Sequence, residues 1–403
     1  MTWRVIVFVI VAQVFAYPQV FSQRGFVNVS TAGYPQTTLN DQAHGLGESV
    51  LLYEAKWRPT PWFTLNGSLE ARADTHRQDE RSLRFDWQNR SLARPSLSLH
   101  RLSAILTKDN WTVELGQQFV RWGTADFLNP TDRFAPKDFL SVLDQETLPI
   151  LAARVTYAKN RNTFDVVWQP LFTPGRIPLF SQRWTLLPPG ANFVVENPVY
   201  PGRSSFGARW DYNASGYEYS LSYYDGFDYL PLFKQLAIAP TPALSLSFAS
   251  LRLYGGDAAI PFKPFTLKME VAYYTSPTQQ EDEHALYLVQ LERQIHELGV
   301  ALAYAGDLVT SAGNTAQSSL ERGFARSIIG HANYVIDPNR SVLLDFVVRQ
   351  NGSGSVVRPK FTEAYGQHWR ITVGYAWLRG SNDDFLGRYH LNSHAIAEVR
   401  YSF

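Results

Sequence analysis

The last ten residues of the chain, HAIAEVRYSF (394–403), alternate between two kinds of side chain. One face of this segment is apolar and ends on Phe403, with Tyr401 two residues before it and Val399 two before that. The other face carries Ser402, Arg400, Glu398 and His394. Successive side chains of a β-strand point to opposite faces, so this pattern predicts a strand with one apolar and one polar side.

The same alternation recurs along the chain in segments of about ten residues, the length of a strand that crosses a membrane. The clearest segment is 369–377, where the apolar face begins and ends with tryptophan and the other face is small or polar. Tryptophan at both ends of a face is typical of a strand whose ends lie at the two membrane interfaces. Further alternating segments are 164–169, 206–212, 267–273, 297–304 and 342–349.

Short and long connections alternate between these segments. Short turns rich in Asn, Asp, Gly and Pro are expected at 59–61, 108–110, 159–161, 213–216, 255–264, 293–295, 337–340 and 366–367. Long loops are expected at 35–45, 75–94, 122–148, 171–202, 227–243, 276–283, 307–324, 351–357 and 380–390. This rhythm predicts about eighteen strands, or sixteen if residues 25–34 stay outside the sheet. Because an open sheet edge is not viable in lipid, residues 25–34 are expected beside the last strand.

Composition narrows the class of protein. Charged residues are 18% of the 403 residues, below the roughly 25% of soluble domains, while aromatic residues reach 14%. A mean hydropathy of -0.21 is too polar for a bundle of membrane helices. The net charge of +1 gives no electrostatic reason to expect nucleic acid as a partner. The absence of cysteine excludes disulfides, thiolate metal sites and cysteine nucleophiles.

The first residues have the pattern of a signal peptide. Arg4 precedes an almost wholly apolar run at 5–15, and the small residues Ala16 and Ser22 follow. About eleven apolar residues are too few to span a bilayer, which needs about 20. We expect residues 1–22 to be a signal peptide cleaved after Ala16 or Ser22, leaving 23–403 as one barrel domain. The alternative is a buried strand or helix at the start of a soluble domain.

The terminal strand with Tyr401 and Phe403 resembles the assembly signal of bacterial outer-membrane proteins, and the whole mature chain resembles outer-membrane porins in architecture. The resemblance implies a single antiparallel up-and-down β-barrel in a Gram-negative outer membrane, with short periplasmic turns and long extracellular loops. Its expected partners are outer-membrane lipid and the barrel assembly machinery, and a homo-oligomer is compatible with it. The run at 116–139 also resembles a WG…NPxD pattern of alginate-export-like and uncharacterised outer-membrane barrels, which implies transport or secretion.

A barrel of this size has room for a water-filled lumen. By alternation its candidate wall residues carry both signs in similar numbers: Arg101, Glu114, Arg154, Asp165, Arg209, Asp345 and Arg349. Mixed charges predict a hydrated interior without strong ion preference. The alternative is that these charges pair with one another and only stiffen the wall.

The third long loop, 122–148, is the candidate constriction, because its position resembles the loop that narrows general porins. Its candidate residues are Asp126, Asp132, Arg133, Lys137 and Asp138. Arg101, Arg154 and Arg209 are the expected basic partners on the wall. The alternative is a solvated outer loop held by local turns and ion pairs.

Motifs of enzymes are missing from the sequence. There is no GxSxG, HExxH or P-loop pattern, so no catalytic, cofactor-binding or metal-binding residue is assigned and the chain is predicted not to be an enzyme. The function predicted is a passive channel for small hydrophilic solutes. The alternative is the barrel component of an export, secretion or partner-holding assembly.

Overall fold

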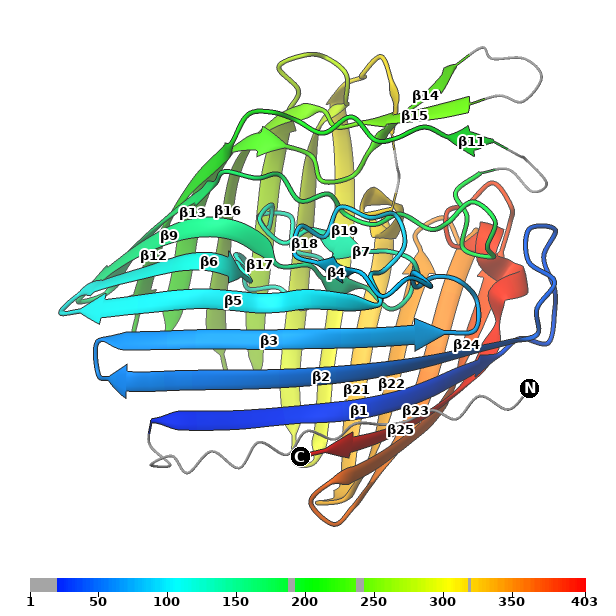
Figure 1. Ribbon diagram of the computed structural model, residues 1–403, viewed down its shortest axis with the longest axis horizontal. Coiled ribbons are helices and arrows are strands. Elements are labelled where there is room, and N and C mark those ends of the chain that lie inside the picture. Colours follow the sequence, from blue (N-terminus) through cyan, green and yellow to red (C-terminus); the bar gives the residue numbers. More distant parts are fainter. Residues whose placement is uncertain (1–19, 188–192, 237–242, 318–319) are drawn as a thin grey trace.

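The computed structural model describes residues 20–187, 193–236, 243–317 and 320–403. They form a long antiparallel sheet that closes on itself into a barrel (Figure 1). Most of the predicted signal peptide, Ala16 included, lies outside the described residues. Among the described residues, no helix is long and apolar enough to cross a membrane.

The sheet contains nineteen strands, of which β4 (Phe85–Asp86) is a two-residue parallel addition to β5, so eighteen build the barrel. Each pairs antiparallel with the next along the chain, which confirms the predicted architecture and strand number. The barrel strands are β1 (Phe21–Gly33), β2 (Gly45–Thr60), β3 (Phe63–Asp74), β5 (Leu97–Lys108), β6 (Trp111–Gln118), β9 (Ile150–Lys159), β10 (Asn162–Gln169), β12 (Ser205–Ala214), β13 (Tyr217–Phe227), β16 (Ser250–Phe262), β17 (Phe265–Thr275), β18 (Glu283–Ile295), β19 (Leu298–Ser311), β21 (Ser327–Asp337), β22 (Arg340–Arg349), β23 (Gly354–Tyr365), β24 (Trp369–Gly380) and β25 (His394–Ser402).

The barrel is closed by its first and last strands. β1 pairs with β25 in a register that places Val27 opposite Tyr401. The amide of Gly25 donates to the carbonyl of Phe403 at 2.8 Å, and the amide of Phe403 donates to the carbonyl of Gly25 at 3.0 Å. A Cβ atom on Gly25 would lie 2.6 Å from the carbonyl oxygen of Leu52 and 2.7 Å from the Phe403 ring. The predicted pairing of residues 25–34 with the last strand is therefore confirmed, and a glycine is required at its end.

Short turns lie at one end of the barrel and long loops at the other, as predicted. One predicted turn is wrong, however, because β16 continues through 255–262 and only Lys263 and Pro264 lie between β16 and β17. The turn is predicted because 255–264 contains Pro261 and Pro264, but the backbone of Gly255 and Gly256 is paired with both neighbouring strands. The cross-strand hydrogen bonds that a membrane barrel requires outweigh the weak strand preference of glycine.

Smaller elements lie within the long loops. Strands β11 (Val194–Val195), β14 (Leu232–Leu236), β15 (Ala243–Ser247) and β20 (Ala316–Gln317) form a separate sheet, which Figure 1 shows above the loop end of the barrel. Strands β7 (Lys137–Asp138) and β8 (Glu146–Thr147) pair inside the third long loop. Two 3₁₀ helices, η1 (Arg322–Phe324) and η2 (Gly387–Asn392), complete the loops.

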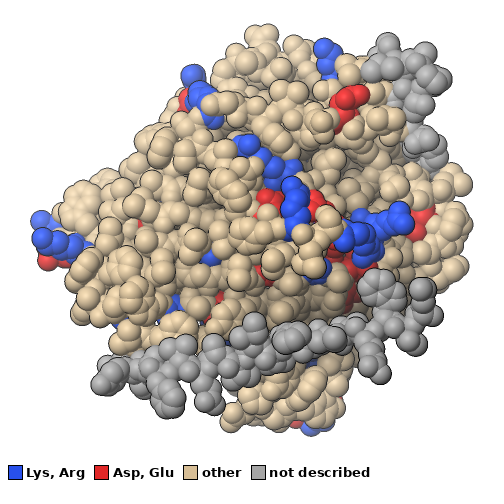
Figure 2. Space-filling model, viewed as in Figure 1, with Lys and Arg blue, Asp and Glu red and all other residues tan. Residues whose placement is uncertain are grey.

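The outward face of the barrel is apolar. On β24, Trp369 and Trp377 are 50% and 47% exposed, with exposed Val373 between them. On the face seen in Figure 2, charged side chains gather toward the loops and the turn tips, while the broad surface of the strands carries few. An apolar band bordered by aromatic side chains is the surface that a barrel presents to lipid.

Candidate functional site

The third long loop, residues 119–149, lies inside the barrel between the end of β6 and the start of β9. Its Phe134 is only 1% exposed and packs against Trp122 of the same loop and Tyr224 of β13, with ring centroids 5.2 and 5.1 Å apart. The inward face of β12 makes room for this ring with Gly207, where a Cβ atom would lie 2.5 Å from Phe134. The loop is therefore seated on the inner wall.

Glu270 of β17 is the main anchor for the loop. Its carboxylate accepts hydrogen bonds from the amide of Ala125 at 3.3 Å, the amide of Thr131 at 2.9 Å and the hydroxyl of Thr131 at 2.8 Å. Gly123 also approaches it, since a Cβ atom there would lie 2.6 Å from the carboxylate oxygens and its φ is +91°. The backbone of the WG…NPxD run thus surrounds the carboxylate of Glu270. Position 123 is a glycine because a side chain there would collide with that carboxylate.

The remaining positions of that run tie the loop together. The side chain of Asp132 accepts the amide of Trp122 at 3.2 Å, and the indole of Trp122 donates to Asp165 of β10 at 3.0 Å. Asp165 also pairs with Arg154 of β9 at 2.8 Å. Burial raises the pKa of Asp132 to about 7, because only one backbone amide and distant cations favour its charged form.

Asp126 holds the loop to the inner face of the same wall at a second point, on β17 and β18. It pairs with Lys268 of β17 at 2.9 Å and accepts a hydrogen bond from Gln290 of β18. Lys268 also contacts Glu292 at 2.9 Å. Burial favours a higher pKa for Asp126, but the hydrogen bonds from Lys268 and Gln290 outweigh it and lower that pKa.

Two buried arginine clusters fix the rest of the loop. Arg133 pairs with Glu321 and lies over the rings of Tyr229 and Tyr274, with centroid distances of 4.8 and 5.2 Å. Glu321, a loop residue, is 7% exposed. The counter-ion and the two aromatic faces together offset the hydration that the buried guanidinium group of Arg133 loses.

Asp138 occupies the second cluster, between Arg94 at 3.0 Å and Arg176 at 3.1 Å. Burial opposes its charge, but the two guanidinium groups hold the pKa of Asp138 well below its usual range. Lys137, next to it, lines a cavity and accepts the amide of Arg176 on its backbone carbonyl at 3.0 Å.

The predicted wall residues face inward, but the predicted pairing of Arg101, Arg154 and Arg209 with the loop is wrong. These arginines pair with carboxylates of the wall itself: Glu114 at 2.9 Å, Asp165 at 2.8 Å and Asp257 at 2.7 Å. Side chains on adjacent strands are only about 5 Å apart, so wall charges find partners next door. The loop acids are bound instead by Lys268, Arg94, Arg176, Arg72 and Arg358.

Asp345 and Arg349 of β22 also have partners. Asp345 contacts His331 of β21 at 2.7 Å, and Arg349 contacts Asp384 at 2.9 Å in the loop before β25. Sequence reasoning missed Asp257, because its segment looked like a turn. The alternation predicted for 267–273 puts Lys268 and Glu270 on the inner face, but it gives no signal that the loop binds them.

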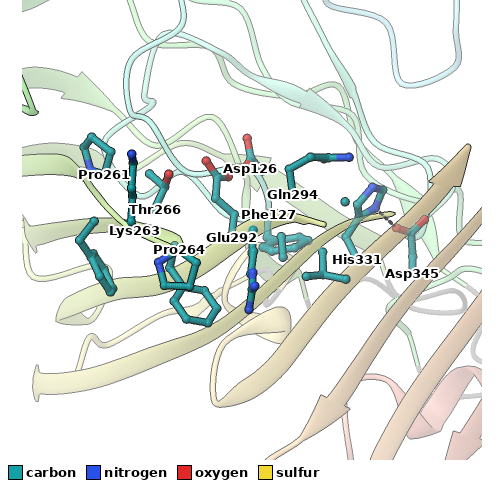
Figure 3. A pocket seen from close by; sticks show the side chains of 16 residues that line it. Asp126, Phe127, Pro261, Lys263, Pro264, Thr266, Glu292, Gln294, His331 and Asp345 are labelled. Atoms are coloured by element: carbon teal, nitrogen blue, oxygen red, sulfur yellow. Dashed lines mark hydrogen bonds and ion pairs between the residues drawn. The ribbon is translucent and has the colours of Figure 1, made fainter. Parts of the chain in front are cut away.

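Among the described residues, cavities lie on several sides of the loop. The largest, 910 Å³, lies toward the turns and is lined by Asp126, Phe127, His331 and Asp345 among others (Figure 3). A cavity of 400 Å³ lies between the loop and strands β21–β23, and one of 680 Å³ borders β1, β2, β3, β5 and β25. The first two share Asp126, Phe127 and Asp345, and the last two share Arg121, Gln145 and Thr147. These shared residues lie between neighbouring cavities.

The loop end of the barrel holds an apolar cluster built from several loops. Trp184 and Tyr389 are 2% and 3% exposed with ring centroids 5.2 Å apart, and Phe139 and Leu386 are also buried there. The hydroxyl of Tyr389 donates to the carbonyl of Trp184 at 3.2 Å. This cluster and the third loop leave the lumen much narrower than the bare barrel.

Comparison with solved structures gives the architecture a context. Acinetobacter baumannii OccAB4 has a TM-score of 0.54 and 11% identity, over 96% of this chain and 99% of that one. The fold is that of an outer-membrane porin. A BenF-like porin from Pseudomonas fluorescens Pf-5 gives a TM-score of 0.55 at 9% identity, over 95% and 97% of the two chains. Pseudomonas aeruginosa OpdQ gives 0.52 at 10%, over 95% and 98%.

At these identities the porin likeness is one of fold. No family model matches the chain, and no curated protein matches it. The likeness of residues 116–139 to alginate-export-like barrels therefore stays a prediction, although the structure gives that run a clear structural role.

Proposed function

We propose that the chain is an outer-membrane channel for small hydrophilic solutes, in which residues 119–149 narrow the passage. The observation that carries the proposal is the seating of this loop inside the barrel on Glu270 and Lys268, with cavities of 910, 400 and 680 Å³ beside it. A barrel of this width needs such a loop to restrict what passes.

The lining of the cavities favours hydrophilic solutes. The middle cavity is bordered by Arg121, Lys137 and Arg358 on one hand and by Asp126 and Asp345 on the other. Charged groups of both signs keep the passage hydrated and disfavour apolar solutes. Volumes of a few hundred Å³ match small molecules rather than folded proteins.

The alternative, a barrel component of an export or partner-holding assembly, needs a wide open lumen. The apolar cluster around Trp184, Phe139 and Tyr389 occupies the loop end, where a polymer or partner would have to pass. This observation favours the channel for small solutes. The alternative predicts an electrically silent barrel that co-purifies with periplasmic proteins.

The proposal implies a location in the outer membrane, contact with its lipid and insertion by the barrel assembly machinery. A homo-oligomer is compatible with the proposal, which assigns no catalytic residue, cofactor or metal.

Phe127 offers a direct test, because it borders both the large and the middle cavity and the chain has no cysteine. In planar bilayers, a thiol-reactive anionic reagent should reduce the single-channel current of Phe127→Cys. Ser82→Cys, an exposed position in the 75–96 loop, serves as the matched control and should be unaffected. Equal currents before and after labelling of Phe127→Cys would contradict the proposed passage.

A further inference from the structure

Three charged residues lie on the outward side of the barrel at its loop end. Asp225 of β13 and Arg252 of β16 are paired positions on adjacent strands, and Arg203 precedes β12. Arg252 contacts one carboxylate oxygen of Asp225 at 3.0 Å, and Arg203 contacts the other. The two arginine side chains are 50% and 49% exposed, against 22% for Asp225.

These residues share a face with lipid-facing side chains. Along β13, Asp225 alternates in step with Leu221 and Tyr223, and along β16 Arg252 alternates in step with Tyr254. Leu221 is 58% exposed and Tyr254 is 52% exposed, whereas the intervening residues are buried toward the lumen. The triad therefore points toward the membrane and not into the channel.

The depth of the triad can be worked out from the strand. Arg252 lies ten residues from Phe262, an exposed aromatic residue at the turn end of β16. A rise of about 3.3 Å per residue and a tilt of about 40° place Arg252 about 25 Å above Phe262. The apolar band of such barrels is also about 25 Å tall. Arg252 therefore lies at the outer interface, just above the rings of Tyr223 and Tyr254, which are 5.3 Å apart.

The charges of the triad do not balance. Two guanidinium groups share one carboxylate, so a surplus positive charge remains at the level of the lipid headgroups. Guanidinium groups form paired hydrogen bonds with phosphate oxygens, and tyrosine rings at this depth pack beside the headgroup and acyl chains.

We propose that Arg203, Asp225 and Arg252 form a binding site for the phosphate of an outer-leaflet glycolipid. Asp225 holds the two guanidinium groups side by side, and the phosphate binds to the donors that Asp225 leaves free. The site lies on the outside of the wall, so it does not depend on whether the channel conducts.

The test is a titration of the purified full-length protein in neutral detergent with bisphosphorylated lipid A, with bound lipid counted by native mass spectrometry. Arg203→Gln/Arg252→Gln should bind about tenfold more weakly than wild type. Arg340→Gln is the matched control, because it opens an exposed Arg–Asp pair with Asp337 at the turn end, and it should bind as wild type does. Unchanged binding in the double variant, or an equal loss in Arg340→Gln, would overturn the proposal.

A second variant covers the case in which the double variant does not fold. Asp225→Asn keeps a side-chain oxygen that can accept from an arginine, so the arginines stay placed, but it removes the negative charge that competes with a phosphate. Lipid A should therefore bind more tightly; unchanged or weaker binding would overturn the proposal. Two lipid arms identify the ligand. Dephosphorylated lipid A should bind to wild type and to the double variant with equal affinity. Tighter binding of this lipid to wild type would contradict a phosphate site. Equal affinity for phosphatidylglycerol would contradict the assignment to a glycolipid.

Discussion

Replacing Glu270 by alanine should release the third loop from the wall. The change removes the acceptor of three hydrogen bonds, from the amides of Ala125 and Thr131 and the hydroxyl of Thr131. At about 1–2 kcal/mol for each of these hydrogen bonds to the buried Glu270 side chain, docking of the loop should weaken by about 3–6 kcal/mol. Since 1.4 kcal/mol corresponds to a factor of ten, the undocked population should rise by two to four orders of magnitude.

Limited proteolysis measures this population. Arg121, Arg133 and Lys137 are trypsin sites within the loop, and Arg133 is buried as long as the loop is docked. Glu270→Ala should be cleaved at these sites at least a hundredfold faster than wild type, and its open-channel current should be larger and noisier. Glu270→Gln, which keeps an acceptor but not the charge, should be intermediate.

The matched control is Glu398→Ala, which removes an inward glutamate of β25 that borders the 680 Å³ cavity, well away from β17 around the barrel. It should be cleaved as slowly as wild type. If Glu270→Ala is no more sensitive than Glu398→Ala, Glu270 does not anchor the loop and the reasoning fails.

Three further outcomes are expected. The pKa of Asp132 is raised to about 7, so docking of the loop is strongest in acid and weakens as pH rises from about 4 to about 7. The melting temperature of Asp132→Asn should therefore exceed that of wild type at pH 8 and equal it at pH 4. A difference in melting temperature that is the same at both pH values would contradict this. Gly25→Ala should lower the fraction of heat-modifiable barrel on detergent gels, because its Cβ meets Leu52 and Phe403, whereas Gly67→Ala, with nothing within 4 Å, should not; equal folding of both variants would count against the role of Gly25. N-terminal sequencing of the exported protein should begin at Tyr17, because cleavage after Ser22 would remove the first two residues of β1, and a start at Gln23 would refute this.

The barrel could be predicted from the sequence because its strands obey a local rule. In β24 and β25 each residue is outward or inward by alternation, and the lipid makes the outward set apolar. Closure then fixed the neighbour of β25 without further information. The prediction failed at 255–264, where the Gly and Pro content indicated a turn but strand pairing overrides that weak local preference.

The interior of the lumen could be predicted only in part. Alternation places Glu270 and Lys268 inward, but their contacts with Thr131 and Asp126 join residues far apart in the chain. Which wall residue meets which loop residue depends on how the loop crosses the lumen, and no periodic pattern encodes that path. The apolar cluster around Trp184 and Tyr389 was missed for the same reason, because irregular loops build it.

The most direct test of the channel is single-channel recording of the wild-type protein in planar bilayers, with heat-modifiable mobility on a gel as proof that the barrel is folded. The passage beside residues 119–149 predicts stepwise openings that small polyethylene glycols reduce and large ones, excluded from the 400 Å³ cavity, leave unchanged. A folded barrel that shows no stepwise current at any voltage would contradict the proposed function.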